Sequence, residues 1–270
     1  MKRILTLGDM HCGHDAGLTP PRWQYTPKKC REASNIHTRT KREKFAAAQR
    51  ESWKWYIRNV KKHGPYDVVV CNGDAIDGRG DRSGGTELVE ADRHDQVTMA
   101  ETCLQQAMGV GTKLVMTFGT AYHTGQEEDF ESLIASDLNA EKIGAHEWIK
   151  TEGVVFDIKH HIGSSGVPHG RHTAIARESL WADLWAERGL VPKHDVLIRS
   201  HVHYFQFCGD GRNLRMTLPA LQTMGSKYGA RRCSGLVDFG FVVFEAQRGD
   251  YTWHPCLADL KTQHAKAVTV

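Results

Sequence analysis

The chain lacks long apolar runs and any segment that would divide it into parts. No hydrophobic stretch of its 270 residues approaches the length needed to cross a bilayer, and Lys2 and Arg3 precede too few apolar residues for a signal-peptide core. No Pro- or Ser-rich linker and no repeat interrupts the sequence. We therefore expect one globular domain over residues 1–270, with no membrane contact.

The chain also lacks a strong excess of either charge. Its formal net charge is +3, whereas proteins that bind a phosphate backbone electrostatically carry a clear basic excess on one face. Basic clusters occur at residues 39–44 and 231–232. For both clusters we favour a solvated surface over a nucleic-acid patch.

Cysteine pairs are missing as well. The seven cysteines form no CxxC pair and no even-numbered framework, which argues against a disulfide scaffold and against a thiolate zinc site. This usage predicts a reducing, cytoplasmic location. Histidine, in contrast, is abundant: the chain has 16, and several follow directly after apolar runs.

The order of apolar runs predicts an α/β fold. Strands expected at residues 3–8, 66–74 and 112–120 alternate with helices expected at 40–63, 90–108 and 127–138, which indicates a parallel sheet with crossover helices. The second half is richer in strands, and these are expected at 153–163, 194–207, 215–221 and 239–246. Its one strong helix is expected at 173–188, where Trp181 and Trp185 would face the core. The whole pattern favours two mixed sheets flanked by helices.

Acidic and histidine side chains follow the ends of the expected strands. Because the carboxyl ends of parallel strands line one crevice, we expect these side chains to converge although they are far apart in sequence. Asp and His without cysteine form a ligand set for borderline divalent metals such as Mn, Fe, Zn or Ni. The residues are Asp9, His11, Asp74, His123, His160, His161, His201 and His203, and Thr120 also follows one of these strands.

Each of these motifs is weak alone, but their order is hard to obtain by chance. The chain reads "GDMH" from Gly8, "GDAID" from Gly73, "GTAYH" from Gly119, "HHIG" from His160 and "SHVH" from Ser200. This series resembles the calcineurin-like metallophosphoesterases, whose pattern is D-x-H, G-D-x-x-D, G-N-H-E/D, a lone H and G-H-x-H. The "GT..H" and "RSHVHYF" elements are most similar to uncharacterised phage and prophage members. The resemblance implies a four-layer α/β/β/α sandwich and, for a phage protein, the host cytoplasm.

The resemblance also implies a dinuclear metal site. Asp9, His11 and His203 would bind the first divalent ion, and Asp74 would bridge both ions. His201, with either His160 or His161, would bind the second ion, and we favour His161 because it lies nearer the glycine.

Two positions depart from the family pattern. Ser200 replaces the glycine before the last histidines, and the asparagine that normally binds the second metal is absent. Thr120 stands in its place, with two extra residues before His123. Either His123 becomes a metal ligand, or Thr120 or water fills the gap and His123 keeps the family role of acid for the leaving group.

The resemblance implies further roles in catalysis and substrate binding. Asp77 would hydrogen-bond His123 and hold its tautomer, while Arg79 would contact the substrate phosphate. His169 and Arg171, in a loop after a strand, are further candidates for substrate contact, and residues 225–232 are comparable to them. The implied reaction is hydrolysis of a phosphate ester by a metal-bound hydroxide, with His123 protonating the leaving oxygen.

Residues 13–40 are expected to form a cap or loop at the active site. Trp23 and Tyr25 would either stack on a base or pack within an ordered surface loop.

The substrate would be a phosphorylated small molecule, a nucleotide or a nucleic acid, and we slightly favour a phosphodiester. The alternatives are a phosphomonoesterase or protein phosphatase of the same fold, or a non-catalytic scaffold with a degenerate second metal site.

Overall fold

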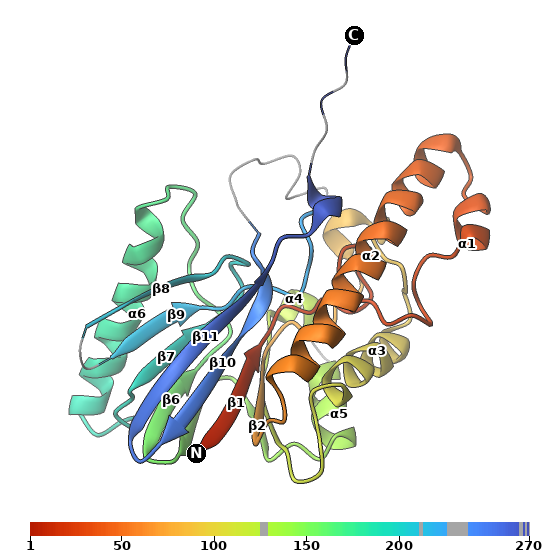
Figure 1. The fold of residues 1–270 in the computed structure, drawn as a ribbon. Coiled ribbons are helices and arrows are strands. Elements are labelled where there is room, and N and C mark those ends of the chain that lie inside the picture. Colours follow the sequence, from red (N-terminus) through yellow and green to blue (C-terminus); the bar gives the residue numbers. More distant parts are fainter. Residues whose placement is uncertain (125–128, 211–212, 226–236, 265–266, 268, 270) are drawn as a thin grey trace.

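The computed structural model describes residues 1–124, 129–210, 213–225, 237–264, 267 and 269. Two mixed β-sheets form its centre (Figure 1). The first sheet has the strand order β11-β10-β1-β2-β3-β4, in which β1 to β4 run parallel and β10 and β11 run antiparallel to their neighbours. Its strands are β1 (Lys2–Leu7), β2 (Val68–Asn72), β3 (Lys113–Thr117), β4 (Lys142–Gly144), β10 (Phe239–Gln247) and β11 (Asp250–Ala258).

The second sheet has the order β5-β6-β7-β9-β8. Its central strands β6, β7 and β9 are parallel, while β5 and β8 close the edges in antiparallel pairing. These strands are β5 (Glu147–Thr151), β6 (Val154–Ile158), β7 (Val196–Arg199), β8 (Gln206–Gly209) and β9 (Leu214–Thr217).

Alternation along the strands distributes apolar side chains between the layers. In β1, Ile4 packs between the two sheets, whereas Leu5 and Leu7 pack toward the helices on the other side. In β7, Val196 and Ile198 face the first sheet, and Leu197 between them faces the opposite way. Because successive side chains in a strand point to opposite faces, the near-continuous apolar runs of these strands are buried on both sides.

Helices cover both outer faces (Figure 1). The first sheet carries α2 (Ile36–His63), α3 (Arg93–Gln105) and α5 (Phe130–Asp137), and the second carries α6 (Gly170–Glu187). Short elements complete the described part: α1 (Pro27–Arg31), α4 (Ala121–Thr124), and the 3-10 turns η1 (Asp81–Ser83) and η2 (Lys261–Gln263). The expected four-layer α/β/β/α sandwich is thereby confirmed.

Several element boundaries differ from those expected. Helix α2 begins at Ile36 rather than near residue 40, because the Asn35 side chain accepts the Thr38 N–H and caps it. The segment 194–207 is not one strand but β7 and β8, with His201 and His203 in the connection. Strands β4, β5 and β11 and the short helix α4 were not expected.

The aromatic side chains of the loop after β1 are buried, whereas one on α6 is exposed. Trp23 and Tyr25 are buried, and Tyr25 donates a 2.6 Å hydrogen bond to Asp15, so the loop packs its own aromatics and these two rings are not free to stack on a base. Trp181, by contrast, is 50% exposed on α6, and its expected place in the core is wrong. Whether residues 13–40 cap the site stays a prediction.

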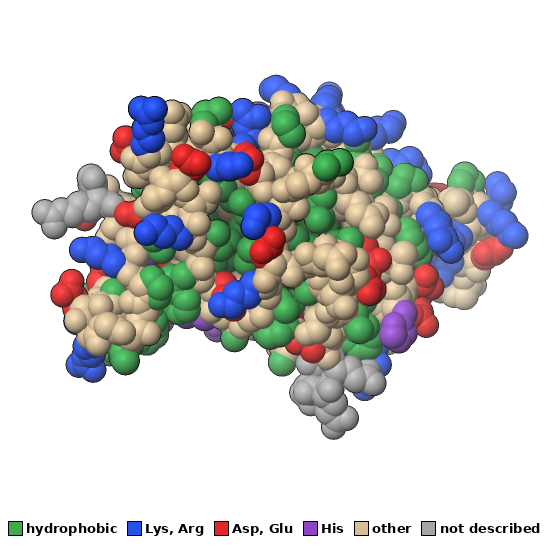
Figure 2. Space-filling view, turned by 90° about the horizontal axis from the view of Figure 1, so that it is seen from below, with side chains coloured by type: hydrophobic (Ala, Val, Ile, Leu, Met, Phe, Trp, Pro, Cys, Tyr) green, Lys and Arg blue, Asp and Glu red, His purple; other side chains and the backbone are tan. Residues whose placement is uncertain are grey.

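The basic cluster 39–44 is largely engaged within the chain. Arg39 pairs with Glu43, Lys41 with Asp15, and Arg42 donates to the Lys29 carbonyl. Residues 231–232 lie outside the described residues. The face opposite the strand carboxyl ends shows blue and red side chains intermingled (Figure 2). Among the described residues, no helix combines the length and apolar character needed to span a bilayer.

Candidate metal centre

The centre is built where central strands of both sheets end. The segments that follow β1 and β2 remain hydrogen-bonded to each other. Asp9 N–H donates to the Gly73 carbonyl and His11 N–H donates to the Asp74 carbonyl, each at 2.9 Å. In the second sheet, Ser200 N–H donates to the His160 carbonyl at 2.8 Å. These bonds hold the loops after β1, β2, β6 and β7 side by side.

The backbone of the centre is held in an unusual conformation. Of the eight non-glycine residues with positive φ in the described chain, five belong to this cluster. Such left-handed residues cost about 1–3 kcal/mol each, and they persist where the surroundings enforce them and concentrate at functional sites. Their φ values are 49° for Asp9, 44° for His11, 51° for Asp74, 73° for His201 and 57° for His203.

Two glycines allow the loops to approach this closely. A Cβ on Gly119 would lie 2.2 Å from both the backbone N and a carboxylate oxygen of Asp74. A Cβ on Gly73, whose φ is +75°, would lie 2.5 Å from Nδ1 of His160. Glycine is therefore required at both positions for Asp74 to sit among its neighbours.

One set of converging donors consists of Asp9, His11 and His203. Their ligand atoms lie within 4.8 Å of one another. His203 Nε2 is 3.2 Å from Asp9 Oδ1 and 3.2 Å from His11 Nε2. Asp9 Oδ1 is buried and accepts no hydrogen bond of good geometry from the described residues.

A second set surrounds Asp74. Asp74 Oδ2 lies 3.1 Å from His160 Nε2 and 3.9 Å from His11 Nε2, so this carboxylate sits between the two histidines. Asp74, His160 and His201 form one group of converging donors, and His11, Asp74 and His123 form another. Thr120 Oγ1 is 3.1 Å from His201 Nδ1 and 3.5 Å from His160 Nε2.

The structure brings His160, rather than the favoured His161, into this cluster. His160 is 1% exposed, whereas His161 is exposed and its ring lies 4.6 Å from that of His201 on the outer side. The physical reason is that consecutive residues of extended chain point to opposite faces, so only one of the pair faces Asp74.

Hydrogen bonds fix the histidine tautomers. His11 Nδ1 lies 3.0 Å from the Asp77 carboxylate, and His160 Nδ1 lies 2.8 Å from the Asn72 carbonyl. A ring nitrogen beside an acceptor carries the proton, which directs the Nε2 atom of each ring into the cluster.

The buried carboxylates of Asp9 and Asp74 and the histidines around them shift one another's pKa values. Burial alone would raise the pKa of Asp74, but the adjacent His160 holds it well below the usual range, and His203 does the same more weakly for the pKa of Asp9. Burial opposes a charge on His160, yet Asp74 raises the pKa of His160 to about 10. Burial, with His160 nearby, lowers the pKa of His201 to about 4. The pKa of His203 is likewise raised, because the Asp9 carboxylate outweighs the effect of burial.

The expected contact between Asp77 and His123 takes a different form. His123 Nδ1 lies 2.9 Å from the Asp77 backbone carbonyl, and the Asp77 carboxylate is 3.5 Å away. That carboxylate is instead committed to His11. The reason is local: α4 places the His123 ring edge-on to His11, with ring centroids 4.5 Å apart, beside the turn that carries Asp77.

The substrate-binding candidates are more dispersed. Arg79 is exposed, two residues beyond Asp77, and His169 is exposed at the start of α6. Arg171 lies with its guanidinium 4.3 Å from the Tyr204 ring centre, next to His203. Their contact with a substrate stays a prediction, and residues 226–232 of the further candidate segment lie outside the described residues.

Sequence reasoning missed Glu131, which lies beneath the centre. This carboxylate is fully buried on α5, and it accepts the Ala75 N–H at 2.9 Å and the Gly119 N–H at 2.6 Å. It therefore clamps the loop carrying Asp74 to the loop carrying Thr120. Burial and the nearby Asp74 raise the pKa of Glu131 to about 8. A glutamate within an ordinary helical pattern gives no signal of this role.

Asn72 and Ser200 form a second support that the sequence did not reveal. Asn72 donates from Nδ2 to Ser200 Oγ at 2.8 Å and accepts from Thr117 Oγ1 at 2.6 Å. Ser200 thus links the two sheets under the centre.

Comparison with known proteins gives only distant likenesses. No family model and no curated protein matches the chain. Among solved structures, Vps29 complexed with zinc from Entamoeba histolytica is 13% identical, with a TM-score of 0.47 over 94% of this chain and 98% of that one. An archaeal phosphodiesterase is 13% identical, with a TM-score of 0.44 over 94% and 99% of the two chains.

A conserved uncharacterized protein from Streptococcus pneumoniae, described as a predicted phosphoesterase, is 9% identical, with a TM-score of 0.37 over 94% and 98%. At these identities and TM-scores, the likenesses say nothing about the activity of this chain.

The Glu131 clamp generates a prediction. Above pH 8, where Glu131 is ionised, Glu131→Gln replaces one accepting oxygen with an NH₂ group that faces a backbone N–H, so the link between the loops of Asp74 and Thr120 is weakened. We expect metal affinity to fall about 10–100-fold, measured by titration with a competing chelator. Glu141→Gln, which alters an exposed partner of Lys113, is the matched control. Equal affinity in both variants would contradict the clamp.

Proposed function

We propose that this chain is a metal-dependent phosphoesterase of the calcineurin-like type. The observation that carries the proposal is the position of Asp74. Its buried carboxylate lies between His11 of one donor group and His160 of another. A carboxylate shared by two groups of Asp and His donors is the arrangement that a pair of divalent ions requires.

The residues present fit such ions. Asp9 Oδ1 is buried without a good hydrogen bond from the described chain, and His11 Nε2 and His203 Nε2 face each other at 3.2 Å beside it. Buried carboxylates are stable only when they are paired or coordinate a cation. The nitrogen and oxygen donors suit Mn, Fe, Zn or Ni.

On this proposal, Asp9, His11, His203 and Asp74 hold one ion. Asp74, His160 and His201 hold the other, with Thr120 Oγ1 or water as a further donor. When bound, the ions lower the pKa of water and neutralise charge on the phosphate oxygens.

His123 is then suited to donate a proton. Its Nδ1 lies 2.9 Å from the Asp77 carbonyl, which leaves Nε2 as the ring atom that would pass a proton to the leaving oxygen. Arg79, exposed beside this turn, supplies a guanidinium for the substrate phosphate. The proposed substrate is a phosphorylated small molecule, a nucleotide or a nucleic acid, with a phosphodiester favoured, in a cytoplasmic setting.

A non-catalytic scaffold is the second candidate, because Thr120 occupies the position of the usual asparagine. A threonine hydroxyl is a weaker donor, which would leave the second ion loosely held. A chain that binds at most one ion and hydrolyses no phosphate ester would have this role.

The adjacent histidines provide a matched pair for the metal assignment. His160→Ala removes a buried nitrogen beside Asp74, so we expect it to lose one metal equivalent. His161→Ala removes an exposed ring and should keep the parent stoichiometry. Elemental analysis after exhaustive dialysis measures both. If the His161 variant lost a metal equivalent and the His160 variant kept it, His161 rather than His160 would be the ligand in solution.

Hydrolysis of chromogenic mono- and diesters with Mn, Ni, Zn and Mg tests the activity. We expect Asp74→Asn to abolish turnover because both ions lose a ligand. His123→Ala should keep its metal and lose about 10²–10⁴-fold in kcat on esters with poor leaving groups, and less on aryl esters, which need little protonation. Metal loss in His123→Ala would instead make His123 a ligand, and parent-like rates in Asp74→Asn would refute the bridging role.

A further inference from the structure

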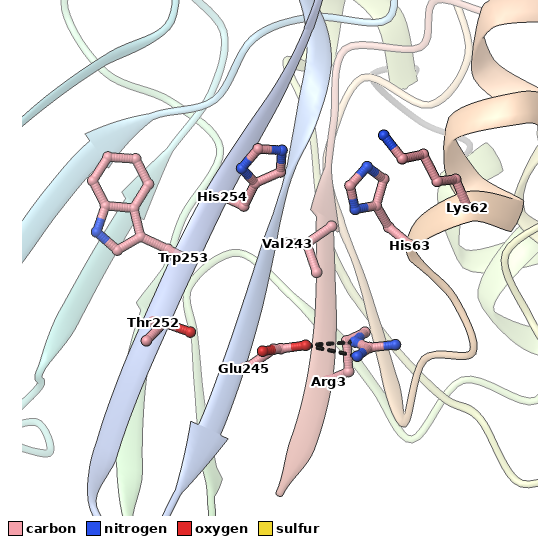
Figure 3. A pocket seen from close by; sticks show the side chains of 8 residues that line it. All are labelled: Arg3, Lys62, His63, Val243, Glu245, Thr252, Trp253 and His254. Carbon is pink, nitrogen blue, oxygen red and sulfur yellow. Dashed lines mark hydrogen bonds and ion pairs between the residues drawn. The ribbon is translucent and has the colours of Figure 1, made fainter.

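A hollow lies on the outer face of the first sheet, below the end of α2. It has a volume of about 420 Å³ and is lined by residues of β1, β10, β11 and the last turn of α2 (Figure 3). Helix α2 ends at His63, so this part of the sheet face has no helix over it (Figure 1). The lining residues are Arg3, Lys62, His63, Val243, Glu245, Thr252, Trp253 and His254.

Three donor side chains converge at the side of this hollow. His63, His254 and Cys256 each offer a ligand atom, and these atoms lie within 4.8 Å of one another. The rings of His63 and His254 stack with their centres 5.3 Å apart, approaching from α2 and from β11 (Figure 3). His254 and Cys256 are two residues apart in β11, so they share one face of the strand.

The three donors differ in access to solvent in a way that suits a bound ion. Cys256 is 5% exposed and belongs to the edge of the hydrophobic core, His63 is half-buried, and His254 is exposed. His63 and His254 line the hollow, and the buried Cys256 sulfur lies beside them. Three protein ligands with one open position is the ligand count of zinc sites that keep an exchangeable fourth ligand.

The charges around the hollow argue against an anion as the occupant. The Arg3 guanidinium is held by Glu245 through both Nε, at 3.0 Å, and Nη2, at 2.6 Å. Lys62 is exposed at the end of α2, beside His63 (Figure 3). A thiol gives no useful hydrogen bond to an anion, but it is a strong ligand for soft and borderline metals.

We propose that His63, His254 and Cys256 bind a thiophilic divalent ion, zinc by preference, separate from the centre around Asp74. Tetrahedral zinc with bonds of about 2.0–2.3 Å holds its ligand atoms about 3.4–3.6 Å apart, so the donors close in by roughly 1 Å. Rotation of the exposed His254 ring supplies that movement. Binding forms a zinc–sulfur bond and releases the thiol proton of Cys256 to solvent, while both imidazoles bind as neutral rings.

The bound ion would tie the end of α2 to β11, the edge strand of the first sheet. Each ligand comes from a regular element rather than from a loop, so the site is held by the fold. This inference is independent of the proposed phosphoesterase activity, because it uses none of the same residues.

Cobalt(II) distinguishes the two candidate metal sites, the one around Asp74 and the one at His63, within the same protein. The candidate ligands around Asp74 include no cysteine, whereas the site at His63 contains Cys256. The full-length chain titrated with Co²⁺ under reducing conditions should develop a near-ultraviolet sulfur-to-cobalt charge-transfer band. Cys256→Ala and His254→Ala should lose that band and one equivalent of bound metal, while His160→Ala should keep the band.

His264→Ala is the matched control, because His264 is another exposed C-terminal histidine, paired with Asp259. It should keep both the band and the stoichiometry. Absence of a charge-transfer band in the parent chain, or a band that persists in Cys256→Ala, would overturn the proposal. His254 is exposed, so His254→Ala is expected to fold, and a parent-like metal count in a folded His254→Ala chain would overturn it as well.

Discussion

The structure depends on the burial of two aspartate carboxylates, Asp9 and Asp74, at the seam where the central strands of both sheets end. They are 0% and 1% exposed. Ions removed from water cost several kcal/mol each unless an opposite charge is close. Histidines from four loops surround them, and the adjacent carboxylates raise the pKa of His160 and of His203 against the effect of burial. In the proposed function, a pair of divalent cations would compensate the same buried charge.

Other features of the fold hold the histidines close to these two carboxylates. Strained φ values at Asp9, His11 and Asp74 turn the chain sharply at the strand ends, so side chains that would otherwise follow the strand direction point into one space. Glycines at positions 73 and 119 allow the turns to touch. Glu131 beneath them and the Asn72–Ser200 contact between the sheets hold the loops at fixed separation. Such supports matter because a metal site tolerates little displacement of its ligands.

The sequence was sufficient for the layer arrangement and for most of the converging residues, because apolar runs in alternation with helices dictate a parallel core, and parallel strands end at one edge. It did not reveal β4, β5 or β11. Sequence reasoning failed where a shift of one residue decides which side chain faces the site. His160 and His161 are equivalent in composition, and only the path of the chain after β6 turns one inward. It failed also where a contact depends on the third dimension alone. The Asp77 carboxylate reaches His11 rather than His123, and Glu131 stands on a helix whose pattern does not distinguish it. Tyr25 finds a buried partner in Asp15 that no local pattern announces.

Anomalous diffraction from crystals grown with manganese tests the central claim most directly. The account predicts two peaks separated by about 3.5 Å, one against Asp9, His11 and His203 and one against His160 and His201, with the Asp74 carboxylate contacting both. Absence of a peak at this seam, or a single peak that Asp74 does not contact, would contradict it.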